Sequence, residues 1–178
     1  MNEKLKELLD NNNVSLDRFF NETYDCFLTS MFEVIVAECS DDNYKLELKN
    51  RLRNSPNKKI VIKNTVNDLM KCLIDDDEAE TILKWVIAFF DKKSTRLNYD
   101  DSVKNRILHY QNNECNICSK RIDLSNSELD HIIPFSMVGD ELGEDNLQML
   151  CTECNRRKSN SVVYNLRMFL INNNKKEG

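Results

Sequence analysis

The chain has 178 residues, of which 40% are hydrophobic and 31% are charged. This length suffices for one sizeable core or for two small units that share an interface. Only three glycines and two prolines are present, which argues against a turn-rich all-β fold and predicts long helices. The net charge of −5 argues against a broad basic surface of the kind that usually binds phosphate.

The acidic excess lies mostly in the first half of the chain. Residues 1–95 carry 14 basic and 18 acidic side chains, whereas residues 96–178 carry 11 and 12. Any DNA binding must therefore be confined to a local surface, assisted by bound metal ions, or supplied by a partner.

No apolar stretch approaches the roughly 20 residues that cross a bilayer. The N-terminal sequence "MNEKLKELLD" also lacks the uninterrupted apolar run of a signal peptide. We therefore expect a cytoplasmic protein with no membrane partner, whose thiols stay reduced. Its seven cysteines then predict metal binding and buried free thiols rather than disulfides.

Apolar residues in the first half recur at the three-and-four spacing of helices with one buried face. The helices expected here cover residues 15–39, 44–53, 65–74 and 78–91. Ser15 is the expected N-cap of the first, and Asp77 with Glu80 would form a capping box on the last. This pattern predicts a small helical bundle over residues 1–95, followed by a linker at residues 91–101.

Three cysteines, Cys26, Cys39 and Cys72, fall within these helices at or beside apolar positions. None has a partner at CxxC spacing. A free cysteine behaves as a small hydrophobic residue in such places, so we expect core thiols rather than metal ligands.

The other four cysteines form two pairs at CxxC spacing, namely Cys115, Cys118, Cys151 and Cys154. Four thiolates are a tetrahedral ligand set that structural zinc prefers. The alternatives are chance pairing or a redox motif, but a redox CxxC is expected beside a βαβ pattern, and none is visible. A site of four cysteines has no open position, so its role would be to hold segments together.

The 32 residues between Cys118 and Cys151 exceed the roughly 15–20 residues of a simple zinc pattern. A short strand is expected over residues 129–133, then a turn-rich connection and a helical turn from Glu144 or Asp145. The two CxxC pairs are called the first knuckle (Cys115 and Cys118) and the second knuckle (Cys151 and Cys154). Another helix, expected to begin at Cys154, follows the second knuckle. Before the first knuckle, Asp101 is expected to cap a helix through Leu108. The second half is therefore a small α+β part.

Within this half, several motifs together resemble the HNH endonuclease family. They are Cys115-x-x-Cys118, Asp130-His131-Ile132-Ile133-Pro134, Asn146-Leu147, Cys151-x-x-Cys154-Asn155 and Lys158. The similarity covers about residues 103–160, a third of the chain. It implies a ββα-metal finger, in which a hairpin and a helix enclose the catalytic centre and the four cysteines bind zinc. Asn155 departs from the histidine that many family members carry there.

The resemblance implies a role for each motif residue. His131 would be the general base, Asp130 and Asn155 would hold one divalent ion, Mg²⁺ or Mn²⁺, and Asn146 would fix the loop that orients the His131 ring. The chemistry agrees, because imidazole titrates near neutral pH and a hard cation prefers oxygen ligands. Since neighbouring strand residues point to opposite sides, we expect a bend or strand end at Asp130 and His131.

A basic run, Arg156, Arg157 and Lys158, follows Asn155. Next to a centre that cuts phosphodiesters, these side chains are expected to contact phosphate. The alternative is a solvated basic face. The second histidine, His109, has no motif around it and is expected at the surface or at an interface.

These observations predict a mainly α protein with a small α+β part. A helical domain at residues 1–95 would precede a zinc-stapled ββα-metal HNH nuclease domain at residues 96–178. The expected function is metal-dependent cleavage of DNA in bacterial defence or restriction. The alternative is a catalytically silent zinc-finger module that binds nucleic acid or a partner protein. The acidic N-terminal domain is expected to dock onto a larger protein subunit such as an ATPase.

Overall fold

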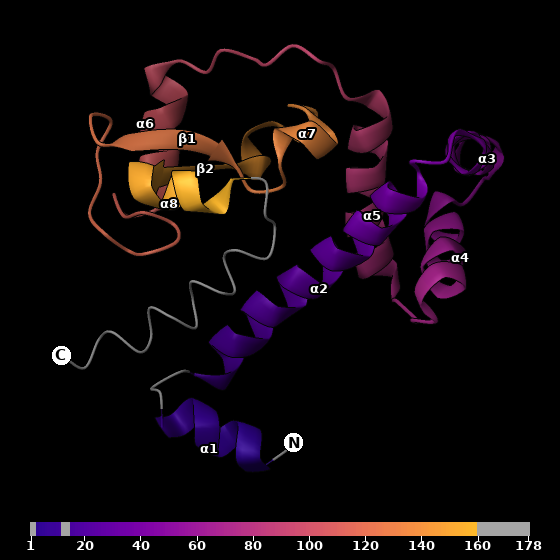
Figure 1. Ribbon diagram of the computed structural model, residues 1–178, viewed down its shortest axis with the longest axis horizontal. Coiled ribbons are helices and arrows are strands. Elements are labelled where there is room, and N and C mark those ends of the chain that lie inside the picture. The colour runs from indigo at the N-terminus through magenta and orange to yellow at the C-terminus, as the bar shows by residue number, and fades with distance from the viewer. Residues whose placement is uncertain (1–2, 12–14, 160–178) are drawn as a thin grey trace. The chain divides into compact units, whose positions relative to one another are not determined.

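The computed structural model describes residues 3–11 and 15–159, and within them the chain is mainly helical with one two-stranded sheet (Figure 1). The elements are α1 (Glu3–Asn11), α2 (Leu16–Glu38), α3 (Asp42–Asn54), α4 (Lys58–Met70), α5 (Asp76–Asp91), α6 (Asp101–Tyr110), β1 (Ser127–His131), α7 (Phe135–Val138), η1 (a 3₁₀ turn, Gly143–Asn146), β2 (Leu147–Cys151) and α8 (Thr152–Lys158). The predicted fold class is confirmed. None of the described helices combines the length and apolar character needed to traverse a bilayer.

The chain packs as two units that alternate along the sequence. Among the described residues, a helical unit contains residues 28–98 and 133–146, and a sheet unit contains residues 3–11, 15–27, 99–132 and 147–159. Helix α2 contributes residues to both. The division of the chain near residue 95 into two domains that act separately stays a prediction, and the packing units do not follow a single cut in the sequence.

The core of the helical unit is formed by apolar faces of α2, α3, α4 and α5. The fully buried side chains at its centre are Phe32, Ile35, Leu48, Ile62, Val66, Ile82 and Val86. Cys39 is buried in this core and Cys72 packs against it, while Cys26 is half-buried in α2 of the sheet unit. All three are free thiols, as expected.

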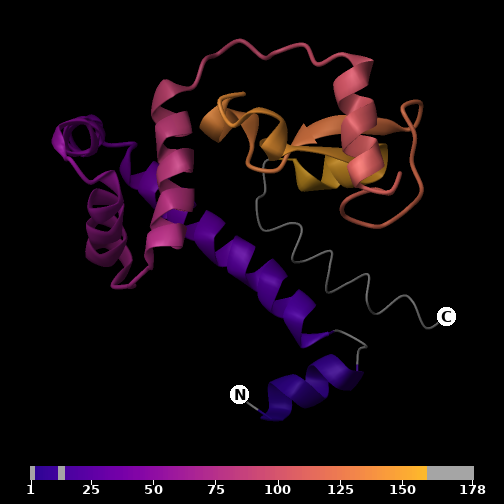
Figure 2. The same ribbon diagram turned by 180° about the vertical axis from the view of Figure 1, so that it is seen from behind.

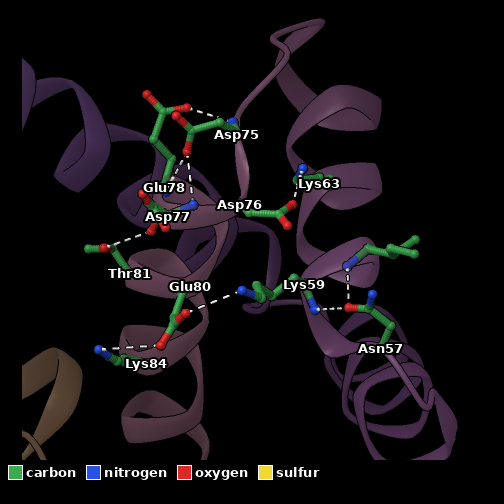
Figure 3. A network of polar contacts seen from close by, with 11 residues as sticks. Asn57, Lys59, Lys63, Asp75, Asp76, Asp77, Glu78, Glu80, Thr81 and Lys84 are labelled. Atoms are coloured by element: carbon green, nitrogen blue, oxygen red, sulfur yellow. Dashed lines mark hydrogen bonds and ion pairs between the residues drawn. The ribbon is translucent and has the colours of Figure 1, made fainter.

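Helix α5 is capped two residues before the predicted cap, by Asp75 instead of Asp77. The Asp75 carboxylate accepts hydrogen bonds from the backbone N–H groups of Asp77 and Glu78, both at 2.9 Å, and the Glu78 carboxylate accepts from the Asp75 N–H at 2.8 Å (Figure 3). The capping box is therefore Asp75 with Glu78, not Asp77 with Glu80. The sequence Asp-x-x-Glu occurs at both positions, and Glu80 is instead paired with Lys59 of α4 at 3.2 Å.

Helix α4 also differs from its prediction of residues 65–74, because it begins at Lys58 and ends at Met70. Asn57 caps its first turn, accepting from the N–H groups of Lys59 and Ile60. The Lys63 ammonium contacts Asp76 at 2.5 Å, so α4 and α5 are joined by ion pairs as well as by the core (Figure 3).

Residues 133–146, which separate the two strands in sequence, pack within the helical unit. Ile133 and Val138 are buried in its core. Lys92, just after α5, donates to the Ser136 carbonyl at 2.5 Å, and the Leu97 N–H donates to Asp140 at 2.8 Å. The loop between the strands is thus held by several contacts with the end of α5 and the segment that follows it.

The sheet unit contains α6, the β1–β2 hairpin and α8 around a separate core (Figure 2). Its buried apolar residues include Ile107, Leu108, Ile117, Ile122, Met149 and Leu150. Asp100, not Asp101, caps α6, accepting from the Ser102 and Val103 N–H groups at 2.9 and 3.1 Å.

Candidate active site

The antiparallel pairing of β1 with β2 positions Asp130 and His131. Asp130 lies opposite Gln148, and His131 lies opposite Leu147 in the last pair of the ladder. The strand covers residues 127–131 rather than the predicted 129–133. It therefore ends at His131, which agrees with the expected strand end.

The strand ends there because Ile133 is bound by a side chain instead of a strand partner. Asn146 accepts from the Ile133 N–H at 2.8 Å and donates to its carbonyl at 3.0 Å. Asn146 is itself 4% exposed, so this clamp is screened from water. It fixes the backbone two residues after His131 in the chain, while its effect on the His131 ring stays a prediction.

Helix α8 lies against the hairpin and presents Asn155 and Lys158, one turn apart, to β1. The Asn155 amide donates to Glu128 Oε2 at 2.5 Å. The Lys158 ammonium lies 2.9 Å from Asp130 Oδ2. Glu128 and Asp130 share one face of β1 because they are two residues apart. The two expected ligands of a divalent ion, Asp130 and Asn155, thus belong to the same helix–strand interface.

Each of these two expected ligands keeps an oxygen available. Asp130 receives both of its contacts on Oδ2. Asn155 must turn its N–H toward Glu128, because a carboxylate only accepts, so its carbonyl oxygen remains for another partner. Within residues 15–159, neither Asp130 Oδ1 nor Asn155 Oδ1 has a hydrogen-bond partner. Oxygens of this kind are the ligands that a hard divalent cation prefers, and the ion site at Asp130 and Asn155 stays a prediction.

Lys158 is the most deeply buried charge of the site. Its side chain is 1% exposed, and its ammonium contacts Asp130 and donates to the His131 carbonyl at 2.7 Å. The expected phosphate contact by Lys158 stays a prediction, and its amine is here occupied by two protein oxygens. Arg156 and Arg157 are exposed. Arg157 forms an ion pair with Glu153 at 2.6 Å.

The four cysteines expected to bind zinc are gathered at one place in the sheet unit. The sulfur atoms of Cys115, Cys118, Cys151 and Cys154 all lie within 4.8 Å of one another, and the Cys118 and Cys151 sulfurs are 3.8 Å apart. A tetrahedral ion with Zn–S bonds of about 2.3 Å requires sulfurs about 3.8 Å apart. The cluster therefore fits structural zinc.

The electrostatics of this cluster also favour a cation at its centre. Burial tends to raise the pKa of the Cys115 thiol, but donation from the N–H groups of Cys118, Cys151 and Ile117 lowers it overall. Burial, followed by the charge of Cys115, raises the pKa of Cys154 strongly. One thiolate thus opposes ionisation of the next, and a bound Zn²⁺ removes that repulsion.

Three polar residues at this site had no role in the sequence interpretation, namely Asn116, Glu128 and Gln148. Glu128 was detectable in principle, because it lies two residues before Asp130, directly before the strand predicted over residues 129–133. Gln148 carried no signal, since a glutamine in an apolar strand has no motif. His109 is exposed on α6, in agreement with its expected surface position.

Comparison with known proteins agrees with this geometry. Residues 115–161 match the family model described as HNH endonuclease. The CRISPR-associated endonuclease Cas9 of Corynebacterium diphtheriae (strain ATCC 700971 / NCTC 13129 / Biotype gravis) is 41% identical over 51 residues, which are 29% of this chain and 5% of that protein. This chain therefore spans a small part of that relative. No solved structure gives a significant match.

The hairpin, the helix over it and the cysteine cluster define a ββα module whose four cysteines fit structural zinc. This module matches the HNH endonuclease family over residues 115–161, and the resemblance seen in the sequence is confirmed.

Proposed function

We propose that this domain hydrolyses phosphodiester bonds of DNA with a divalent ion, Mg²⁺ or Mn²⁺, held by Asp130 and Asn155. One observation carries the proposal: β1 and α8 bring these two residues to one interface with an open oxygen on each, beside His131 at the end of β1. The four cysteines would hold one Zn²⁺ that ties the knuckles together.

In this mechanism His131 acts as the general base. Its imidazole takes a proton from a water molecule, and the resulting hydroxide attacks phosphorus. The bond from phosphorus to the leaving sugar oxygen breaks, and that oxygen takes a proton from solvent. A divalent ion held by Asp130 and Asn155 would supply positive charge that stabilises the transition state and the leaving oxygen. Arg156 and Arg157 would position the strand through its phosphates.

The test is cleavage of supercoiled plasmid across a series of metal ions. Wild-type protein should cut with Mg²⁺ or Mn²⁺, and His131→Ala should lower the rate by about 100-fold or more, the usual contribution of a general base. His109→Ala is the matched control, because it removes the other histidine and should leave the rate unchanged. Zinc content should be equal in all three proteins.

Two outcomes would contradict the proposal. Undiminished cleavage by His131→Ala would overturn the assignment of the base. Absence of cleavage by wild-type protein with full zinc content would favour the alternative, a catalytically silent zinc-finger module that binds nucleic acid or a partner. Parallel assays with RNA would define the substrate class.

Three wider expectations remain predictions. A role in bacterial defence is supported by the name of the Cas9 relative, which is CRISPR-associated. Docking of residues 1–95 onto a larger subunit such as an ATPase rests on the acidity of that segment and on the lack of another DNA-binding motif in its sequence. Cytoplasmic localisation also stays a prediction.

A further inference from the structure

Gln148 is a buried polar residue within a strand whose five residues are all buried. Its side chain is 1% exposed. An amide removed from water is unfavourable unless its hydrogen bonds are replaced. Gln148 is bonded at both ends: Oε1 accepts from the Asn116 amide at 2.9 Å, and Nε2 donates to Asp130 Oδ2 at 3.0 Å.

Asn116 belongs to the first zinc knuckle, between Cys115 and Cys118. Its backbone N–H donates to the Met149 carbonyl at 3.4 Å, and the Cys151 N–H donates to the Cys115 sulfur at 3.4 Å. The knuckle is therefore attached to β2 on the C-terminal side of Gln148. Closure of the cysteine cluster sets the position from which the Asn116 side chain reaches Gln148.

At its other end, Gln148 acts directly across the hairpin, because it is the register partner of Asp130. Two donors converge on Asp130 Oδ2, the Gln148 amide at 3.0 Å and the Lys158 ammonium at 2.9 Å. Donors arriving from a strand and from a helix limit rotation of the carboxylate. The oxygen left without a partner among the described residues is Oδ1.

We propose that Asn116 and Gln148 are positioning residues that connect the first zinc knuckle to Asp130 and direct its Oδ1 toward the divalent ion. The proposal rests on the proposed function, since it takes Asp130 as a ligand of that ion. Partners of this kind typically change metal affinity or activity by about 10–100-fold when removed. A role limited to satisfying buried polar groups would change stability alone.

The decisive measurement is the dissociation constant of Mn²⁺, the probe ion, followed by electron paramagnetic resonance on the zinc-loaded full chain. Gln148→Met keeps the length of the side chain and removes both hydrogen bonds. We expect it to weaken Mn²⁺ binding about 10-fold, with one zinc per chain retained. Asp130→Ala should abolish the same binding, which identifies the site.

Gln111→Met is the matched control. Gln111 also bonds to β2, accepting from the Met149 N–H and donating to the Met149 carbonyl, both at 2.8 Å, but it has no bond to Asp130. This variant should lower the thermal midpoint and leave Mn²⁺ binding unchanged. Asn116→Ala changes an exposed residue and should also weaken Mn²⁺ binding. It keeps the proposal testable if Gln148→Met does not fold.

The proposed connection from Asn116 through Gln148 to Asp130 is called the relay below. An Mn²⁺ dissociation constant unchanged in both Gln148→Met and Asn116→Ala would overturn the relay, as would a wild-type protein without Asp130-dependent Mn²⁺ binding. Failure of the proposed function has a different signature, namely Asp130-dependent Mn²⁺ binding without plasmid cleavage. The relay can hold in that case, because it concerns ion binding rather than turnover.

Discussion

At the scale of single residues, the ion pair between Lys158 and Asp130 decides how the site is organised. The Lys158 side chain is 1% exposed and that of Asp130 is 17% exposed, so the pair is largely removed from solvent. The same ammonium also binds the His131 carbonyl. One buried cation therefore holds α8 against the end of β1.

We predict that Lys158→Met lowers the free energy of unfolding by about 3 kcal/mol, because removing one partner of a buried pair leaves the other charge without compensation. Urea denaturation of the zinc-loaded protein measures it. Arg157→Met is the control, since Arg157 and Glu153 are 59% and 69% exposed and the expected change is about 0.5 kcal/mol or less. Equal losses of unfolding free energy in the two variants would show that the buried ion pair of Lys158 stabilises the fold no more than the exposed pair of Arg157.

At the scale of elements, helix starts depend on which of several similar residues forms the cap. The run Asp75, Asp76, Asp77 and Glu78 supplies three acidic residues to the first turn of α5, where they complement the positive end of the helix. The cap itself is Asp75, and local sequence could not separate it from Asp77. The cap lies at the start of the acidic run, where the chain leaves the connection between α4 and α5. The next residue, Asp76, forms an ion pair with Lys63 of α4.

Asp75→Ala should lower the free energy of unfolding by about 1 kcal/mol, because it removes the two side-chain hydrogen bonds that cap α5. Asp77→Ala removes the same charge two residues later in the chain and should change stability much less. Thermal or urea unfolding of the two variants side by side makes the comparison. A larger loss in Asp77→Ala would mean that the capping box predicted from the sequence, Asp77 with Glu80, was right.

At the scale of the whole molecule, the chain combines a helical unit with an apolar core and a sheet unit whose cysteine cluster fits a metal ion. The sheet unit has two short strands and one small core, a size at which a structural metal commonly supplies much of the folding free energy. All four cysteines of the cluster (the quartet Cys115, Cys118, Cys151 and Cys154) lie in the sheet unit and none lies in the helical unit. The two units should therefore respond differently to loss of zinc.

We expect the purified protein to carry one zinc per chain, and chelation to remove amide-exchange protection from β1, β2 and α8 while α4 and α5 keep theirs. Cys154→Ser should lose the zinc. Cys39→Ser is the control, because Cys39 lies in the core of the helical unit and outside the quartet. Full protection of β1 and β2 in zinc-free protein would contradict a structural role for the ion.

The sequence by itself determined the helical character of the chain, the cysteine quartet and the HNH motif residues, because periodicity, CxxC spacing and short motifs are local properties. The predicted bounds of some elements were wrong by a few residues, because tertiary contacts compete with local secondary structure. At Ile133, for example, the Asn146 side chain takes the backbone hydrogen bonds that a strand partner would have taken. The site assignments made from the sequence for His131, Asn146 and Asn155 stay predictions with tests.

Only the tertiary structure decided which side chains meet. It placed Glu128 against Asn155, buried the Lys158 amine beside Asp130, and linked Asn116 to Asp130 through Gln148. It also packed residues 133–146 with the helical unit. These contacts join residues far apart in the chain, and they depend on which faces of strands and helices pack together, a property that no local pattern contains.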